Sequence, residues 1–398
     1  MTNLKGKYAI VGIGETKVGK LPGVGTLTLH VDAVKRALDD AGMKPSEIDG
    51  LLTNQPLHDP FRTYSIVVAQ ALGIAPDYSL DLGLGGATPV AMAQHAAMAI
   101  EAGLATAVAC VHARNQNSLR YLPLGGMGVT RATHGGVRDG AEDFEEPFGM
   151  ASGPGTHAFV AARHMHEFGT TSEQLGAIAV TTRNHAAKNP GATMFGKPIT
   201  LEDHQKSRWI VEPLRLLDCS LVTDGGAAFV VVSAERARDM KQKPVYIMGL
   251  GNHQPHAQLA DAETLTTLGG KISSEMAYKM AGLGPKDMDF AQIYDCFTIT
   301  TLVTLEDYGF CPKGEGGRWV GDGSRIRVDG ELPVNTHGGL LSHGHLEGMT
   351  HITEAVKQLR GGQVVPELQI KDAEVGIVSG HGGNASTHAT MILSKSPN

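Results

Sequence analysis

The sequence predicts an α/β fold made of two pseudo-symmetric halves, and three observations support this prediction. Strand-like and helix-like segments alternate along a chain of 398 residues, which is longer than a single hydrophobic core usually organises. Apolar runs such as residues 227–234 (AAFVVVSA) are typical of strands buried on both faces of a sheet. A helix-and-strand pattern near the N-terminus also recurs late in the chain. We therefore expect sheets packed between layers of helices.

The internal repeat begins with residues 33–53 and 274–295, each a predicted helix followed by a predicted strand. Gly42 and Gly282 stand where each helix should end, because glycine readily adopts the left-handed conformation that satisfies the last carbonyl groups. A proline three residues after each glycine prevents the helix from resuming. Two helix ends built alike indicate a duplication.

The likeness between the halves continues through a glycine turn, a helix and two strands. The matched segments are residues 85–103 with 344–362, 106–113 with 374–383, and 227–234 with 389–395. A charged, proline-ended segment, residues 235–244, follows the first set. We therefore place the boundary there, between an N-terminal half of residues 1–240 and a C-terminal half of residues 241–398.

The segment at about residues 112–210 has no counterpart in the second half, so it is predicted to be an insertion that covers a pocket. It contains a run rich in glycine and proline, residues 147–157 (PFGMASGPGTH). Thr170 and Glu173 have the spacing of a capping box at the start of a helix. The insertion is therefore expected to be partly ordered.

Composition narrows the class of protein. The formal net charge of −7, with no strong basic run, argues against a nucleic-acid-binding surface and against binding to an anionic membrane. The four cysteines form no C-x-x-C pair, which indicates neither a disulfide framework nor a cysteine zinc site. No stretch approaches roughly eighteen uninterrupted apolar residues, and the N-terminus lacks the apolar region of a signal peptide. A cytoplasmic enzyme fits these observations.

Three segments carry a resemblance to a known family: residues 218–237 (DCSLVTDGGAAFVVVSAERA), 294–310 (YDCFTITTLVTLEDYGF) and 335–359 (NTHGGLLSHGHLEGMTHITEAVKQL). With the duplicated halves, they resemble the thiolase superfamily, specifically its sterol-carrier-protein-type branch. The match covers essentially the whole chain, and the N-x-x-G-G motif followed by a G-H pair is specific. The resemblance implies a thiolase fold with five α-β-α-β-α layers, acyl-coenzyme A substrates, a homodimer and an active site where the halves meet.

In this family, the elbow between the strand and helix of the first glycine turn carries a nucleophilic cysteine. The matching position here is Gly86, and no cysteine lies near it. A second family cysteine is expected in residues 379–383 (SGHGG), which also lack a thiol. Because an acyl-enzyme needs a nucleophile, ordinary thiolysis is not expected. Gly85 and Gly86 are instead expected to present backbone N–H groups that hold the thioester oxygen as negative charge develops.

The resemblance narrows further to the thiolase-like aldolases that shorten steroid side chains. In those aldolases a tyrosine stands first in the motif that other branch members begin with His or Asn, and here that residue is Tyr294. A phenol with a pKa of about 10 needs a hydrogen bond or nearby positive charge to act as a base at neutral pH. His345 is the expected partner, either lowering the pKa of the phenol or reprotonating the enolate. This histidine departs from the aldolase pattern, which has a second tyrosine there.

Six more candidate site residues follow from the same motifs: Asn335, Cys296, His337, Gly339, His381 and Gly382. Asn335 is expected to hold a water or the thioester oxygen, although loop capping is its ordinary role. His337 either positions substrate or packs beside its neighbouring glycines, and His381 is either a site residue or a turn residue. Cys296 is as consistent with a small buried hydrophobe as with a reactive thiol.

No cofactor is expected to be bound, apart from coenzyme A as part of the substrate. His164 and His166 lie on a predicted helix with no thiol or carboxylate set at ligand spacing, so no metal site is expected in this chain. The resemblance implies a small zinc-ribbon and OB-fold partner protein, assembled with this chain as a heterotetramer. The zinc would then belong to the partner.

Three functions remain open at this point. The leading one is retro-aldol cleavage of a β-hydroxyacyl-CoA, with a steroid side-chain ester among the possible substrates, to a ketone or aldehyde and a shorter acyl-CoA. The second is a thiolase or acetyltransferase that uses a non-standard cysteine, with Cys296 as the candidate. The third is a non-catalytic subunit that binds acyl-CoA or acts as a scaffold. Tyr294, Asn335 and His345 weigh against the third, because a pure scaffold needs no converging polar groups.

Overall fold

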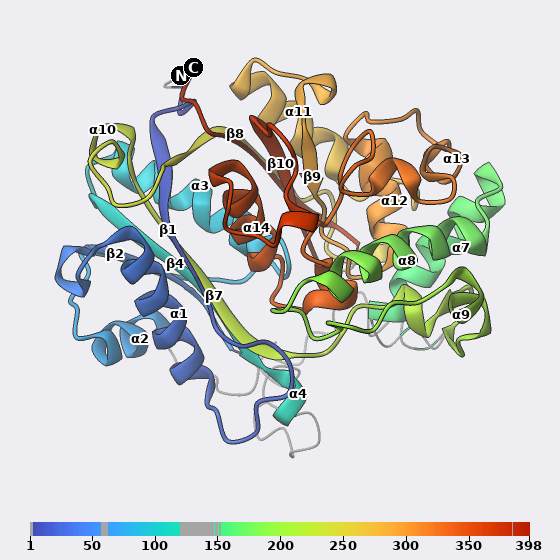
Figure 1. The fold of residues 1–398 in the computed structure, drawn as a ribbon, viewed down its shortest axis with the longest axis horizontal. Helices are drawn as coiled ribbons and strands as arrows, with labels where there is room; N and C mark the ends of the chain where they lie inside the picture. Colours follow the sequence, from blue (N-terminus) through green and yellow to red (C-terminus); the bar gives the residue numbers. More distant parts are fainter. Residues whose placement is uncertain (1–2, 57–62, 120–146, 148–149, 151–152, 384) are drawn as a thin grey trace.

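The strands of the two halves join edge to edge. The computed structural model describes residues 3–56, 63–119, 147, 150, 153–383 and 385–398 (Figure 1). In these residues nine strands form one mixed sheet in the order β3–β2–β4–β7–β1–β8–β11–β10–β9. The strands are β1 (Tyr8–Glu15), β2 (Gly50–Asn54), β3 (Tyr78–Leu82), β4 (Ala107–Asn115), β7 (Asp224–Ser233), β8 (Val245–His253), β9 (Phe290–Gln292), β10 (Val375–Gly382) and β11 (Thr387–Ser394).

The pairing of the strands repeats in the two halves. In the N-terminal half, β1 pairs with β7 and β7 with β4, both antiparallel, and β4 pairs with β2 in parallel. In the C-terminal half, β8 pairs with β11 and β11 with β10, both antiparallel, and β10 pairs with β9 in parallel. The parallel bridge between Ala291 and Val334 matches the pairing of β2 with β3. The predicted pseudo-symmetry is therefore confirmed. Within the sheet, the two halves meet where β1 pairs with β8 through two residue pairs.

The helices complete the layers. They are α1 (Thr26–Ala41), α2 (Tyr64–Leu72), α3 (Thr88–Glu101), α11 (Gly270–Ala281), α12 (Thr298–Asp307) and α14 (Met349–Arg360). Helix α3 contacts β4 as well as β10 and β11, and α14 contacts β1 and β7 as well as β10, so both helices lie between the two sets of strands (Figure 1). Helices α1 and α2 cover the N-terminal strands, and α11 covers β8 and β11. This arrangement is the predicted five-layered α-β-α-β-α thiolase fold.

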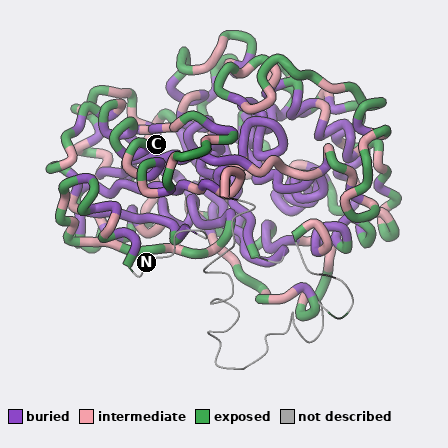
Figure 2. Tube along the Cα trace, turned by 90° about the horizontal axis from the view of Figure 1, so that it is seen from below, coloured by how far each residue is buried: buried purple, intermediate pink, exposed green. Residues whose placement is uncertain are grey.

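The central layer fits between the strands because its side chains are small. Five alanines of α3 are buried: Ala91, Ala93, Ala96, Ala97 and Ala99. Alanine also has the highest intrinsic helix propensity, so the same composition supports the helix and a close approach of the strands. Figure 2 shows buried residues along the strands and central helices, with exposed residues on the outer loops.

The two helix ends that signalled the duplication adopt the predicted geometry. Gly42 and Gly282 end α1 and α11 in the left-handed conformation, with φ of 74° and 68°. A 3₁₀ turn follows each, Pro45–Glu47 and Pro285–Asp287. These helix ends could be predicted from the sequence because a helix cap depends on only a few neighbouring residues.

The insertion and the residues just after it contribute further elements, of which α7 and α8 pack on the C-terminal half. The elements are α4 (Gln116–Leu119), α7 (Gly153–Phe168), α8 (Ser172–Lys188), α9 (Leu201–Lys206), β5 (Trp209–Val211) and β6 (Leu214–Arg215). Helices α7 and α8 contact α12, and α8 also contacts α13 (Gly316–Val320). In the glycine- and proline-rich run, residues 148–149 and 151–152 lie outside the described residues, and residues 153–157 form the start of α7. The chain then passes through α10 (Ala234–Ala237) to β8, across the segment where the boundary between the halves was expected.

The capping box at the start of α8 is one residue from its predicted place. Thr171, not Thr170, caps the helix, and its partner is Gln174 in place of Glu173. Thr170 instead places its Oγ1 2.8 Å from Nδ1 of His164. None of the helices in the described part of the chain combines the length and the apolar character needed to cross a bilayer.

Candidate functional site

Two glycine-rich turns, one from each half, touch through their backbones. A Cβ on Gly382 would lie 2.1 Å from the carbonyl oxygen of Leu84, and one on Gly380 would lie 2.7 Å from that of Gly86. Gly85 also has φ of +55°. Side chains at these positions would push the turns apart, so packing alone requires glycine at Gly382 and Gly85. Their predicted contact with substrate stays a prediction.

The ring of Tyr294 occupies the space beside Gly86. A Cβ on Gly86 would lie 2.1 Å from both Cε2 and Cζ of the tyrosine ring, which is closer than any real contact. Tyr294 follows β9 and is 3% exposed. A nucleophilic side chain at position 86 and this tyrosine ring therefore cannot coexist. The tyrosine ring fills the space into which any side chain at position 86 would project.

The first N–H groups after the elbow are already used within the turn. Ala87 donates to the carbonyl of Leu84 at 3.2 Å, and Thr88 donates to that of Gly85 at 3.0 Å. Pro89 has no N–H group to offer. The N–H groups of Gly85 and Gly86 are the ones left for the predicted oxyanion role, which stays a prediction.

Tyr294 and His345 lie together as the sequence predicted, within a larger network. The Tyr294 hydroxyl is 3.0 Å from Nε2 of His345, and it donates to Oε2 of Glu347 at 2.9 Å. Arg114 donates to the other carboxylate oxygen of Glu347 at 2.5 Å. Nδ1 of His345 lies 3.2 Å from Oγ of Ser220. We call Ser220, His345, Tyr294, Glu347 and Arg114 the Tyr294 network.

The positions of the protons follow from these contacts. Because the phenol donates to Glu347, His345 must donate to the phenolic oxygen through an Nε2–H group, and Ser220 then donates to its Nδ1. The loop before α14 supports this geometry: the N–H of His345 donates to Oγ1 of Thr223 at 2.9 Å, and Glu347 has φ of +51°. The network thus forms a continuous path from a hydroxyl to a carboxylate.

The electrostatics of the pair differ from the prediction. Burial, followed by the charge of Glu347, raises the pKa of Tyr294 well above its ordinary value, whereas the sequence led us to expect His345 to lower it. Burial opposes ionisation of Glu347, but Arg114 and His345 together hold the pKa of this carboxyl well below its usual range. The resting site therefore contains a neutral phenol that hydrogen-bonds to a charged carboxylate. Tyr294 can take up a proton only as it passes its own to a neighbour.

A cavity of about 270 Å³ opens beside the network. Glu347, Arg114 and His112 line one part of it, and Gly85 and Thr88 of the elbow line another. Burial lowers the pKa of His112 to about 3, so the imidazole faces the cavity as a neutral group. The volume is near the lower end of ligand pockets, roughly 300 Å³.

Asn335 holds the backbone before Tyr294. Its Oδ1 accepts the N–H of Ile293 at 2.7 Å, and its Nδ2 donates to the carbonyl of the same residue at 2.8 Å. These two bonds use one lone pair and one N–H of the amide. Asn335 is placed to position Tyr294, and its predicted contact with a water or thioester oxygen stays a prediction.

Asp295 anchors the other side of the tyrosine. Its carboxylate accepts the N–H of Leu340 at 2.7 Å and lies 3.2 Å from Nε2 of His351. It also fills the space beside Gly339, where a Cβ would lie 2.0 Å from Oδ2. The candidate Gly339 is therefore needed to admit this carboxylate, and Tyr294 is held on both sides by buried polar groups.

His337 is not brought to the Tyr294 network. It packs against His343 and His351, with ring centroids 5.1 and 4.9 Å away, and is buried. Neither ring nitrogen has a hydrogen-bond partner among the described residues. Burial, then the neighbouring histidines, lowers its pKa well below the ordinary value. Of its two predicted roles, packing agrees with this environment.

His381 and Cys296 meet a histidine that sequence reasoning did not select. Nε2 of His381 lies 3.3 Å from Nε2 of His157, and Sγ of Cys296 lies 3.7 Å from the same nitrogen. Burial raises the pKa of the Cys296 thiol far above its ordinary value, which disfavours a thiolate nucleophile there. The Tyr294 and His381 rings are 6.1 Å apart, so this cluster adjoins the Tyr294 network.

Sequence reasoning missed Glu347, Arg114 and His157. Glu347 stands two residues after His345 inside the quoted motif, so its place beside a catalytic histidine was a usable signal. Arg114 lies near the end of β4, and His157 lies in the first turns of α7. Nothing in the spacing of these last two connects them with Tyr294.

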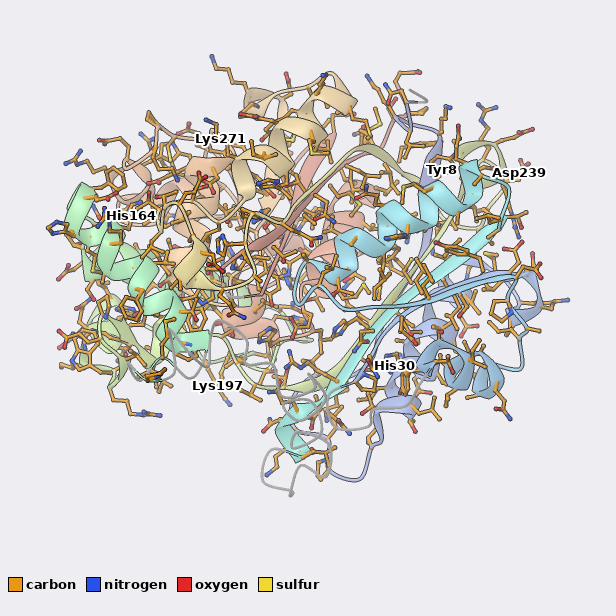
Figure 3. The ribbon with its side chains drawn as sticks, turned by 180° about the vertical axis from the view of Figure 1, so that it is seen from behind. Tyr8, His30, His164, Lys197, Asp239 and Lys271 are labelled. Carbon is orange, nitrogen blue, oxygen red and sulfur yellow. The ribbon has the colours of Figure 1, made fainter. Side chains whose placement is uncertain are left out.

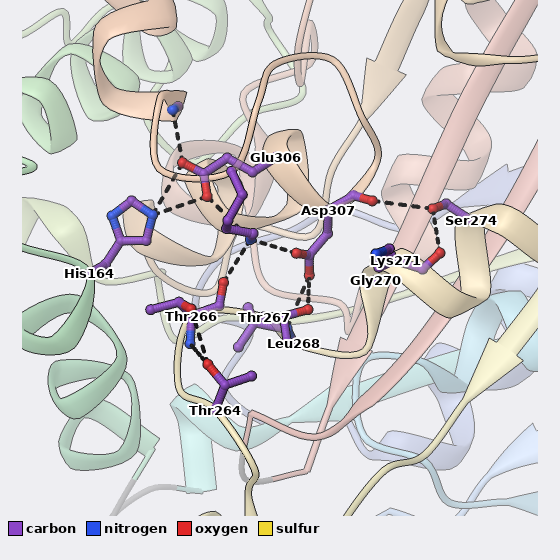
Figure 4. A network of polar contacts seen from close by, with 12 residues as sticks. His164, Thr264, Thr266, Thr267, Leu268, Gly270, Lys271, Ser274, Glu306 and Asp307 are labelled. Carbon is purple, nitrogen blue, oxygen red and sulfur yellow. Dashed lines mark hydrogen bonds and ion pairs between the residues drawn. The ribbon is translucent and has the colours of Figure 1, made fainter. Parts of the chain in front are cut away.

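A second group of buried charges lies where the insertion meets the C-terminal half. His164 on α7 and His30 on α1 lie in opposite halves of the view in Figure 3. Nε2 of His164 is 3.1 Å from both carboxylate oxygens of Glu306, which also accepts the N–H of Gly316 and pairs with Lys313 (Figure 4). Lys313 pairs with Asp307 as well, at 2.6 Å. We call His164, Glu306, Lys313 and Asp307 the Glu306 cluster.

Comparisons with known proteins agree with this architecture. Residues 251–395 match the family model described as thiolase C-terminal domain-like. The chain is 42% identical over 373 residues to the 17-hydroxy-3-oxo-4-pregnene-20-carboxyl-CoA lyase of Mycobacterium tuberculosis, covering 91% of this chain and 94% of that protein. It is 40% identical over 372 residues to the steroid side-chain-cleaving aldolase of Thermomonospora curvata, covering 92% and 93%.

A solved structure extends the likeness to three dimensions. The chain is similar to the Ltp2-ChsH2(DUF35) aldolase, with a TM-score of 0.87, 38% sequence identity and coverage of 99% of both chains. The two relatives and this solved structure align with most of the chain, and the fold has the α-β-α-β-α layers of the family. The protein therefore belongs to the thiolase superfamily, in the sterol-carrier-protein-type branch that includes the side-chain-cleaving aldolases.

Proposed function

We propose that the protein is a carbon–carbon lyase that cleaves a β-hydroxyacyl-CoA by a retro-aldol reaction. The observation that carries the proposal is the exchange at the elbow, where the Tyr294 ring fills the space that a nucleophile at position 86 would need. An acyl-enzyme therefore has no side chain at that elbow on which to form. A proton-transferring phenol stands in its place.

The reaction follows the hydrogen bonds of the Tyr294 network. The phenolic oxygen takes the β-hydroxyl proton of the substrate while its own proton moves to Glu347. The β-carbon becomes a carbonyl, the Cα–Cβ bond breaks, and its electron pair forms an enolate of the shorter acyl-CoA. The proton then returns from Glu347 through Tyr294 to Cα, so atoms and charge balance and no other reactant is consumed.

Three groups support the proposed reaction, two at the proton path and one at the thioester oxygen. Arg114 keeps Glu347 charged before the reaction and stays beside it when it becomes neutral. His345 donates to the phenolic oxygen, which stabilises any negative charge that develops there. The Gly86 N–H group is the proposed donor to the thioester oxygen.

The substrate class comes from the relatives. One is named as a lyase of a pregnene carboxyl-CoA ester and another as a steroid side-chain-cleaving aldolase. We extend this class to the present chain, with coenzyme A entering as part of the substrate and no other cofactor proposed for the reaction.

The alternatives fit the site less well. A thiolase that used Cys296 would need a thiolate in a buried position that raises the thiol pKa. A silent scaffold would not need a charged carboxylate, a phenol and an imidazole beside a cavity.

The proposed assembly is a homodimer joined by a small zinc-ribbon and OB-fold partner to give a heterotetramer. The support is the name of the similar solved structure, which joins the aldolase to a DUF35 protein. A cytoplasmic location agrees with the four cysteines, all of which are free thiols.

The test uses panels of β-hydroxyacyl-CoA and β-ketoacyl-CoA esters, each with and without free coenzyme A and with and without the partner. Mass spectrometry should find equal amounts of a ketone or aldehyde and a shortened acyl-CoA from a β-hydroxyacyl ester, without consumption of free coenzyme A. Cleavage only of β-ketoacyl esters, with absolute dependence on free coenzyme A, would establish a thiolase instead.

A further inference from the structure

Three potential metal ligands converge from three separate segments. His157 belongs to α7 of the insertion, Cys296 precedes α12, and His381 lies in β10. Their ligand atoms all lie within 4.8 Å of one another, and all three residues are buried. No spacing motif joins them, so a metal site here could not be predicted from the sequence.

Two of the three distances are those of a tetrahedral metal site. With bonds of about 2.0–2.1 Å to nitrogen and about 2.3 Å to sulfur, tetrahedral zinc places two nitrogens roughly 3.3 Å apart and nitrogen and sulfur roughly 3.6 Å apart. The nitrogens of His157 and His381 are 3.3 Å apart, and Sγ of Cys296 is 3.7 Å from the His157 nitrogen. The third pair, Cys296 and His381, lies within 4.8 Å, so an adjustment of these side chains brings all three ligand atoms to one ion.

The surroundings orient His157 as a ligand. Its Nδ1 lies 2.9 Å from the carbonyl oxygen of Gly153, which can only accept, so this nitrogen carries the proton and Nε2 presents a lone pair. Such a bond from the second ring nitrogen is the usual support of a metal-bound histidine. The ring also stacks on Phe297 at 4.4 Å.

Hydrogen bonding leaves part of this cluster unsatisfied. Cys296 has a second neighbour, Oγ1 of Thr300 at 3.4 Å, but Nδ1 of His381 has no partner among the described residues. The His157 nitrogen has one lone pair in the plane of the ring, yet both His381 and Cys296 approach it. Only one of them can donate to it well. A cation at the centre would bind a lone pair from each of the three groups.

We propose that His157, Cys296 and His381 bind a thiophilic divalent ion, with zinc as the representative metal. Binding displaces the thiol proton of Cys296 to solvent, and a water or a substrate atom completes the tetrahedron. The ion would join α7 of the insertion to β10 and the loop before α12. It would therefore stabilise the position of the insertion next to the Tyr294 network.

The test uses the full chain purified without any partner, so that zinc held by another protein cannot contribute. After treatment with a chelator, equilibrium dialysis against zinc chloride and elemental analysis should find one tightly bound zinc per chain. Cobalt chloride should give a sulfur-to-cobalt charge-transfer band. Zinc should also raise the melting temperature, because a ligand that binds the folded state stabilises it.

Two variants and a matched control assign the ligands. His157→Asn keeps a donor for the Gly153 carbonyl but removes the metal-binding nitrogen, and Cys296→Ala removes the thiol. Each should weaken zinc binding by at least roughly 100-fold, since even the loss of an outer partner can cost that much. Cys311→Ala also removes a buried thiol but should bind like the wild type.

Three results would overturn the proposal. They are a wild-type chain that binds no more zinc than Cys296→Ala, a cobalt complex without the sulfur band, and equal binding by folded His157→Asn. Should Cys296→Ala fail to fold, His157→Asn and the cobalt spectrum of the wild type decide the question.

Discussion

The Tyr294 network and the Glu306 cluster contain similar groups and differ in access. Each joins a carboxylate, a histidine and a cation from segments distant in the sequence. The side chains of Glu306 and His164 are 0% exposed. Those of Glu347 and His345 are 20% and 17% exposed. Both groups border a cavity: Glu347 lines the one of about 270 Å³, and Glu306, Asp307 and Lys313 line another of about 580 Å³. A buried ion pair alone is therefore no sign of a functional site.

The partners of the two carboxylates sharpen the difference. Glu306 is bound by a backbone N–H group, a lysine and a histidine. Glu347 is bound by the Tyr294 hydroxyl and by Arg114, and it lines the cavity beside the elbow. A phenol that can pass its proton to such a carboxylate is what supports the proposed catalytic role of the Tyr294 network.

The largest expected effect comes from Tyr294→Phe. Removing the phenolic oxygen should lower turnover by about 10²–10⁴-fold, the usual contribution of a general acid–base group, because the proton path is cut. Acyl-CoA binding and melting temperature should change little, because the ring still packs and Glu347 keeps Arg114. Product formation, ligand titration and thermal melting measure the three quantities. A wild-type rate would remove Tyr294 from the mechanism.

Glu347→Gln should have the next largest effect. The amide still accepts a hydrogen bond from the phenol but cannot take up its proton at neutral pH, so turnover should fall by about 10²-fold. Combining it with Tyr294→Phe should be little worse than the tyrosine variant alone, because both act on one proton. Fully additive losses would mean that Glu347 acts separately from the tyrosine.

Gly86→Ala tests the steric exchange at the elbow. The new methyl group would collide with the Tyr294 ring and shift its hydroxyl, which should lower turnover by up to about 10²-fold. Gly25→Ala is the matched control, because a Cβ there meets open space. If Gly86→Ala loses only stability and keeps its turnover per folded molecule, the ring does not depend on this glycine for its position.

Glu306→Gln should give the opposite pattern and the smallest effect on turnover. Loss of charge beside His164 and Lys313 should lower the free energy of unfolding by about 1–3 kcal/mol. Turnover per folded molecule should stay at the wild-type value. Denaturant unfolding measures the stability, and the rate per folded molecule measures the turnover. A lower turnover with unchanged stability would contradict the proposed difference between the two clusters.

The parts of the fold that follow from local residues could be predicted from the sequence. Gly42 and Gly282 can be recognised as helix ends from the few residues around them. The repeated order of helices and strands predicts the two halves. The capping box at Thr171 was one residue off, because neighbouring threonines offer similar spacing and tertiary contacts decide between them. Tyr294 and His345 were found because their motifs identify them.

The rest of the site depends on contacts that no local pattern encodes. Arg114 and Glu347 are 233 residues apart, and they meet only because β4 and the loop before α14 pack together. His157 reaches Cys296 across 139 residues in the same way. The pKa of Tyr294 was expected to fall because His345 was foreseen and Glu347 was not. Its direction depends on burial and on the charge of Glu347, which only the folded structure reveals.

The most direct test of the central claim is the mass of the intact protein during turnover. Enzyme mixed with excess β-hydroxyacyl-CoA is quenched in acid while product is still accumulating and is then analysed by mass spectrometry. Because Tyr294 occupies the space of a nucleophile, we predict an unmodified mass throughout, with ketone or aldehyde forming in step with the shortened acyl-CoA. An acyl adduct that forms and decays at the rate of turnover, and maps to Cys296, would contradict the account.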